Sequence, residues 1–146
     1  MEFTDSVRSI LDDKGSNVYC ITPSHTVYDA LEQMSRLSIG ALMVLDDEKI
    51  VGIISERDYA RKIILKGKAS KDTLVREIMS EKLSCVTLSQ TVQECMALMT
   101  ERHVRHLPVI DGQDKVLGIL SIGDLVKETI SDQKFTIEQL VHYIQN

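Results

Sequence analysis

The chain has 146 residues, of which 43% are hydrophobic and 27% are charged, and its formal net charge is −5. This length suits one compact domain or two small repeats with a shared core, and the composition excludes a disordered or fibrous protein. The negative charge and the absence of Trp argue against a nucleic-acid partner, because polyanions are repelled and few side chains remain for base stacking.

The cysteine and hydropathy patterns predict a cytoplasmic protein without membrane contact. The three cysteines, at positions 20, 85 and 95, show neither zinc-ligand nor redox spacing, which fits a reducing compartment. No apolar stretch approaches the roughly 20 residues of a membrane span. The acidic start MEFTDS is unlike a signal peptide.

Residues 1–17 are predicted to contain a short amphipathic helix. Val7, Ile10 and Leu11 fall on one helical face, and Gly15 is a typical helix stop.

Residues 18–68 predict a strand, a helix, two strands and a further helix. VYCI alternates as a short strand, and Thr26 with Asp29 forms a capping box. ALMVL and KIVGII are apolar runs joined by the charged turn DDEK, a pattern typical of a hairpin with buried strands. Ser55 and Asp58 then cap a helix whose apolar residues Tyr59, Ile63 and Ile64 should face inward.

Residues 84–131 repeat this plan after a polar linker, residues 69–83, in which Val75, Ile78 and Met79 predict a short docking helix. SCVTL is the expected strand, followed by a helix from Thr91, the strands LPVI and KVLGIL, and a helix from Ser121. The inward residues expected of the first of these helices are Val92, Cys95, Met96 and Met99. Residues 132–146 predict a separate terminal helix that begins at a capping box formed by Thr136 and Gln139.

The two segments match closely enough to be an internal repeat. VGIISERDYARKI at residues 51–63 returns as LGILSIGDLVKET at residues 117–129. Equivalent residues of the two repeats are 65 positions apart before the turn DGQDK and 66 apart after it, because that turn has one extra residue. The register holds over about fifty residues, so chance is a poor explanation. One such unit buries little surface alone, and the two copies should pack together.

This double β-α-β-β-α unit, with its Gly-Ile-apolar-Ser turn and Ser-x-x-Asp, resembles a pair of cystathionine β-synthase (CBS) domains of the stand-alone bacterial kind. The resemblance implies an α/β (α+β) fold in which two repeats pack with pseudo-twofold symmetry into one CBS-pair (Bateman) module. It also implies clefts between the repeats that accept adenosine-containing nucleotides such as AMP, ATP or NAD. Such modules commonly form homodimers and regulate a separate protein.

The basic run before LPVI and the Ser-x-x-Asp after KVLGIL are the candidate ligand residues. Ser121 and Asp124 read first as a capping box, and the adjoining helix start offers N–H groups to an anion. Arg102 and His103 fit a solvated helix end, whereas the resemblance assigns Arg105 and His106 to ligand phosphates and Asp124 to ribose hydroxyls. A guanidinium suits phosphate and a carboxylate suits paired hydroxyls.

The resemblance completes this stronger cleft with Thr22 and Gly40 at the adenine and Ile119 as part of its wall. It assigns a second cleft to Ser55, Asp58 and Thr87, with Arg105 or its neighbours. We expect Arg57 and Arg61, on the helix after Ser55, to compensate there for missing phosphate cations. Here the first repeat has Gly40-Ala41 where the second has Arg105-His106, so we expect unequal sites, or one ligand that uses both.

Other functions find less support in the residues. No catalytic residue is assigned, because no nucleophile–base pair, Walker loop or Gly-x-Ser-x-Gly stands out, and we do not expect an enzyme. We expect no metal site, since no carboxylate or thiol completes a ligand set with His103 and His106. The alternative is a constitutive dimerisation or scaffold module without ligand. Nucleic-acid binding would require that KGKASK and residues 102–106 form one basic patch.

Overall fold

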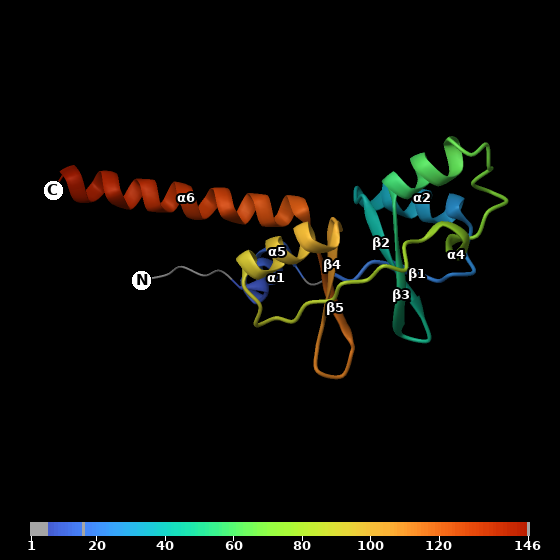
Figure 1. The fold of residues 1–146 in the computed structure, drawn as a ribbon, viewed down its shortest axis with the longest axis horizontal. Coiled ribbons are helices and arrows are strands. Elements are labelled where there is room, and N and C mark those ends of the chain that lie inside the picture. The colour runs from blue at the N-terminus through green and yellow to red at the C-terminus, as the bar shows by residue number, and fades with distance from the viewer. Residues whose placement is uncertain (1–5, 16, 146) are drawn as a thin grey trace. The chain divides into compact units, whose positions relative to one another are not determined.

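The computed structural model of the protein describes residues 6–15 and 17–145. The chain divides into two compact units, which Figure 1 shows as ribbons. The first-repeat unit consists of residues 17–83 with 112–116. The second-repeat unit consists, among the described residues, of 6–15, 84–111 and 117–145.

The first-repeat unit is a three-stranded sheet with helices. Strand β1 runs parallel to β2, and β2 pairs antiparallel with β3, so the order is β1-β2-β3. In chain order its elements are β1 (Cys20–Ile21), α2 (Val27–Leu37), β2 (Ala41–Asp46), β3 (Lys49–Ser55), α3 (Glu56–Tyr59), the π-helical turn η1 (Ala60–Ile64) and α4 (Val75–Ile78).

Helix α2 shows how local sequence sets these elements. The Thr26 hydroxyl accepts from the Asp29 N–H at 3.1 Å, and the Asp29 carboxylate accepts from the Thr26 N–H at 3.4 Å, which confirms the predicted capping box. The buried face of the helix carries Val27, Ala30 and Met34, spaced by three and four residues as expected for one helical stripe. This face packs into the core of the unit with the apolar strands.

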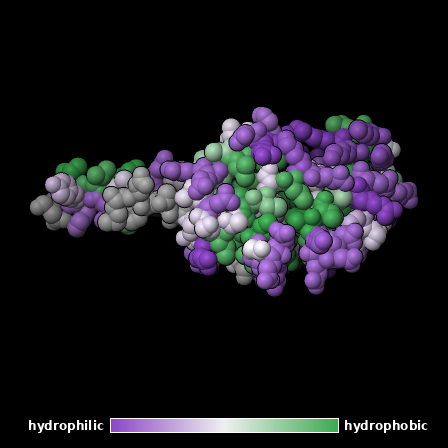
Figure 2. Space-filling view, turned by 60° about the horizontal axis from the view of Figure 1, so that its bottom comes forward, coloured by the Kyte–Doolittle hydropathy of each residue, from purple (hydrophilic) through white to green (hydrophobic). Residues whose placement is uncertain are grey.

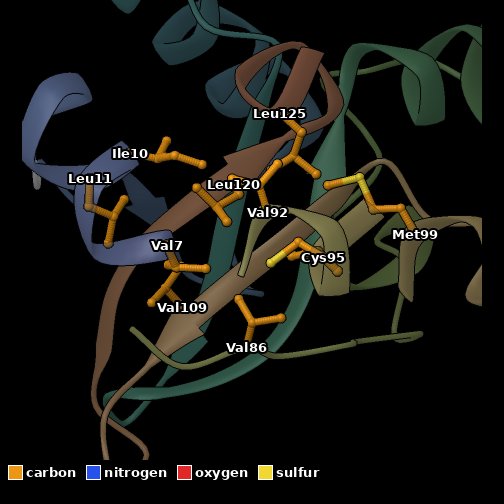
Figure 3. Close-up of a cluster of buried hydrophobic side chains, with 11 residues drawn as sticks. Val7, Ile10, Leu11, Val86, Val92, Cys95, Met99, Val109, Leu120 and Leu125 are labelled. Carbon is orange, nitrogen blue, oxygen red and sulfur yellow. The ribbon is translucent and has the colours of Figure 1, made fainter. Parts of the chain in front are cut away.

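The second-repeat unit is built around a two-stranded hairpin. Its elements are α1 (Val7–Lys14), α5 (Val92–Arg102), β4 (His106–Ile110), β5 (Val116–Ser121) and α6 (Ile122–Gln145). Side chains from both helices and strands meet in one apolar core, as Figure 3 shows. The strand expected at SCVTL shrinks to a single bridge, in which the Val86 N–H donates to Pro108 and the Ile110 N–H donates to Val86.

The two short helices α1 and α4 have equivalent places in the two units. At the start of α1, the Val7 N–H donates to the Gln90 carbonyl at 2.9 Å and Ser6 bridges Thr91. At the start of α4, Leu74 likewise bridges Thr26, the counterpart of Thr91. Helix α1 precedes the first repeat in the sequence but packs into the core of the second. Helix α4 follows the first repeat and packs into the core of the first.

Two glycines make these helix contacts possible. A Cβ at Gly118 would lie 3.0 Å from a Leu11 methyl group on α1. A Cβ at Gly52, the repeat partner of Gly118, would lie 2.7 Å from the Met79 sulfur and 3.0 Å from the Ser80 carbonyl oxygen. The repeated glycine is thus explained by close approach of the segment that packs across each strand.

Three details of the sequence prediction are wrong. Ile64 is 58% exposed, because the π-helical hydrogen bond from the Leu65 N–H to the Ala60 carbonyl widens the turn and takes Ile64 off the buried face. Met96 is 39% exposed beside α6. Thr136 caps no helix, because α6 runs unbroken from Ile122 to Gln145. Within the described residues no helix, α6 included, is both long and apolar enough to span a membrane.

Candidate functional site

The predicted Ser-x-x-Asp of the second repeat forms the start of helix α6. Ser121 ends β5, and its N–H donates to Asp124 Oδ2 at 2.8 Å while its hydroxyl accepts from the Asp124 N–H at 3.2 Å. These reciprocal bonds are the expected capping box. They fix a carboxylate at the positive end of a 24-residue helix, where an anion is also stabilised by the helix dipole.

Arg105 lies against this helix start. The Ile122 N–H, at the first position of α6, donates to the Arg105 carbonyl at 2.9 Å. Arg105 is exposed, and half-buried His106 begins strand β4 directly after it. The backbone therefore holds the predicted cation and the predicted carboxylate on adjoining segments of one unit.

The structure adds a residue that the sequence did not indicate, Lys14 at the end of α1. Its ammonium group donates to Asp124 Oδ2 at 2.7 Å and to the Ile119 carbonyl at 2.8 Å. Burial would raise the pKa of Asp124, but the hydrogen bonds from Lys14 and Ser121 and the charge of Lys14 outweigh it and lower that pKa. Asp124 is consequently ionised at neutral pH.

The first repeat builds the same corner with a different lysine. Ser55 and Asp58 form the expected capping box, with the Ser55 N–H at 3.0 Å from Asp58 Oδ2 and the Asp58 N–H at 3.2 Å from the Ser55 hydroxyl. Lys62, one turn further on, lies 3.5 Å from Asp58 Oδ1 and donates to the Ile78 carbonyl at 2.8 Å. Arg57 and Arg61 are exposed on the same helical segment.

Gly40 occupies the position of Arg105 in this corner. Its carbonyl accepts from the Glu56 N–H at 3.0 Å, as the Arg105 carbonyl accepts from Ile122. A Cβ at Gly40 would meet nothing within 4 Å, so packing within the protein does not require glycine here. The first repeat therefore keeps the backbone contact and the carboxylate but lacks the cation before the strand.

Thr22 and Thr87 lie at the start of equivalent turns that precede helices α2 and α5. The Thr22 hydroxyl lies 2.6 Å from His25 Nδ1 and 3.2 Å from the Ser24 hydroxyl. The Thr87 N–H donates to Gln90 Oε1 at 2.9 Å. Both threonines are exposed, so neither side chain is used up in a core.

The predicted residues thus fall into two groups. The second-repeat unit holds Arg105 and Asp124 on neighbouring segments, His106 on β4, and Ile119 and Ser121 on β5. Thr87 lies in a turn of the same unit. The first-repeat unit holds Thr22, Gly40, Ser55, Arg57, Asp58 and Arg61. The missed Lys62 carries a local signal, its i,i+4 spacing from Asp58. Lys14 carries none, because it contacts residues more than a hundred positions away.

The remaining candidate reactive groups are the cysteines and possible metal ligands, and they give no sign of a catalytic or metal site in the described residues. Cys95 is buried in the second-repeat core, and burial with the nearby Glu94 charge raises the pKa of its thiol to about 11. The thiol therefore stays protonated at neutral pH and is a poor nucleophile. Among residues 6–15 and 17–145, no three His, Cys, Asp or Glu side chains gather as a metal site would require.

The two repeats thus form matched corners, each with a capping carboxylate at a strand–helix junction. The sequence matches the CBS domain family at residues 7–65 and again at 75–131, and the chain belongs to that family, whose paired domains are regulatory ligand-binding modules. The pair of matches agrees with the internal repeat and with the α+β fold of the two units.

Known proteins with this module support the assignment. The chain is 43% identical over 137 residues to the CBS domain-containing protein CBSX3, mitochondrial, of Arabidopsis thaliana, covering 90% of this chain and 65% of that relative. A solved structure of a protein with CBS domains from Burkholderia ambifaria is 51% identical, with a TM-score of 0.83 over 88% of this chain and 96% of that one. Inosine-5'-monophosphate dehydrogenase of Methanocaldococcus jannaschii is 31% identical over 112 residues, 76% of this chain but 21% of that enzyme.

Proposed function

We propose that this protein binds an adenosine-containing nucleotide, of the AMP, ATP or NAD class, at the corner formed by Arg105, Ser121 and Asp124. The observation that carries the proposal is a carboxylate held by a capping box at a helix start whose first N–H donates to the carbonyl of an exposed arginine. The carboxylate accepts hydrogen bonds from the ribose hydroxyls, and the guanidinium binds phosphate near the positive end of the helix. His106 adds a second donor beside Arg105.

The proposal extends to residues that the CBS resemblance assigns to the base. Thr22 and Gly40 would contact adenine, and Ile119 would form part of the wall. Thr22 presents an exposed hydroxyl, and the space around Gly40 is open. An exposed hydroxyl can hydrogen-bond to the polar edge of adenine, and open space at Gly40 leaves room for its flat ring.

We further propose that a second, weaker site uses Ser55, Asp58 and Thr87. Its phosphate cations would be Arg57 and Arg61, which are exposed on the helix after Ser55 rather than before the preceding strand. The different placement of the cations supports unequal affinities.

In this proposal the nucleotide changes how a homodimer of CBS pairs presents itself to a separate regulated protein, and the chain itself catalyses no reaction. A ligand can do so only if it prefers one arrangement of the module. We place this activity in a reducing compartment such as the cytoplasm, as expected from the three cysteines.

Lys14 supports a competing function, a constitutive scaffold with no ligand. Its ammonium group already pairs with Asp124 Oδ2 at 2.7 Å, so the charge of the carboxylate is compensated without a ligand. In the sensing proposal the ribose must share Asp124 with Lys14 or displace it.

A thermal-shift titration with AMP, ATP and NAD separates the two functions. A ligand at ten times its Kd should stabilise the protein by about 1.4 kcal/mol, a rise of a few degrees in Tm. Asp124→Asn, whose Kd should be at least about tenfold higher, should reduce the stabilisation to about 0.4 kcal/mol or less, and the matched variant Asp58→Asn should retain most of it. The absence of a shift with every nucleotide would support the scaffold instead.

A further inference from the structure

The C-terminal part of helix α6 carries an apolar stripe that the rest of its unit does not cover. Figure 1 shows α6 running on past α5, and Figure 2 shows apolar side chains along one edge of the projecting helix. Ile130 is 58% exposed, Ile137 60%, Leu140 57% and Ile144 80%. These side chains lie beyond the part of the helix that supplies the core residue Leu125.

The stripe follows a heptad repeat. Ile130, Ile137 and Ile144 are seven residues apart and occupy the a positions, while Val126, Gln133 and Leu140, also seven apart, occupy the d positions. All six are exposed, and they span about 27 Å of helix at 1.5 Å per residue. An apolar a/d stripe is the seam of a coiled coil, and within parallel coiled coils β-branched residues at a, combined with Leu at d as at Leu140, favour two helices over three or four.

We propose that a second copy of this chain covers the stripe, so that two α6 helices form a short parallel coiled coil from Val126 to Ile144. The heptad pattern is self-complementary, and an identical helix supplies the knobs and holes that it requires. This interface is independent of nucleotide binding.

The polar and charged residues favour the parallel orientation. In a parallel pair Gln133 meets Gln133 of the other copy, and two amides can hydrogen-bond to each other. In the antiparallel pair that aligns the same stripe, Gln133 would face Ile137 and its amide would be buried against an apolar side chain. Lys134, at an e position, would then also face Lys134 of the other copy, whereas the parallel pair sets it beside Thr129.

Sedimentation of the full chain tests the surface. The double variant Ile137→Glu/Leu140→Glu puts charges into the seam and should raise the dimer dissociation constant by at least about a hundredfold. The control Ser131→Glu/Gln139→Glu adds the same charge on the outer face of the same helix and should leave the constant unchanged. Equal constants for both variants would overturn the proposal.

Disulfide trapping of the full chain tests the orientation. Ile144→Cys should cross-link to itself under mild oxidation, whereas Gln139→Cys and the natural sequence should not. The cross-link should disappear when Ile137→Glu/Leu140→Glu is added. If Ile144→Cys fails to cross-link, or if it links only to a cysteine introduced at Val126, the parallel pairing is wrong.

Discussion

Replacing Lys14 with methionine removes the ammonium group that holds Asp124 but keeps the length and packing of the side-chain stem. Lys14 donates to Asp124 at 2.7 Å and to the Ile119 carbonyl at 2.8 Å, so both acceptors lose a charged donor. Hydrogen bonds to charged groups are worth about 1.5–3 kcal/mol when buried, and exposed ion pairs about 0.2–1 kcal/mol. The Lys14 side chain is 37% exposed and that of Asp124 21%, which places this pair between the two cases.

We therefore expect Lys14→Met to lower the free energy of unfolding by about 1 kcal/mol at pH 7, roughly 3 °C in Tm. The assay is urea unfolding of the natural protein, Lys14→Met, Asp124→Asn and the double variant. The coupling between the two positions should account for most of the loss. Lys66→Met, which removes an exposed lysine of the first-repeat unit, is the control and should change stability little.

The loss should depend on pH in a defined direction. Because the folded-state pKa of Asp124 is lowered, its ionised form stabilises the fold above the unfolded-state pKa, near 4, and this stabilisation is lost as the pH falls through the lower folded-state pKa. Lys14→Met should raise that pKa, so less of the stabilisation from ionised Asp124 remains to be lost as the pH falls. The difference between the two proteins should shrink below about pH 4. A difference that stays constant from pH 7 to pH 3, or a similar loss in Lys66→Met, would refute the reasoning.

Two further predictions concern packing. Gly52→Ala should destabilise the fold by about 2 kcal/mol and Gly118→Ala by about 1 kcal/mol in urea unfolding, because the first Cβ meets the Ser80 backbone at 3.0 Å and the second only the end of the Leu11 side chain; the reverse order would contradict this. Burial raises the pKa of Cys95 to about 11, so its thiol should resist iodoacetamide at pH 8 until the protein is denatured. Mass spectrometry measures the alkylation of each cysteine. If Cys95 in the native protein reacts as fast as the other two cysteines, its burial is wrong.

The features that sequence predicted best are those fixed within a few residues. Ser55 with Asp58 and Ser121 with Asp124 form capping boxes in the structure because each pair spans one helical turn and needs no distant partner. Gly15 ends α1 with φ 91°, a backbone conformation that glycine adopts at little cost.

Features that depend on distant partners could not be read from the sequence. The amphipathic pattern of α1 predicts a helix with one apolar face, but not that this face packs on the second repeat through Val7 and Leu11. The contact of Lys14 with Asp124 follows from that docking and has no local pattern. The exposure of Ile64 follows from a π-helical turn, which hydrophobic spacing at 3.6 residues per turn does not anticipate.

The ligand proposal depends on the ionised carboxylate at the start of α6, and calorimetric titration of AMP tests it most directly. The protein should bind AMP, and Asp124→Asn, which keeps a capping side chain but lacks the charge, should bind at least about tenfold more weakly. Asp58→Asn should bind with nearly natural affinity. Equal affinity of Asp124→Asn and the natural protein for AMP, or no heat of binding from either, would contradict the account.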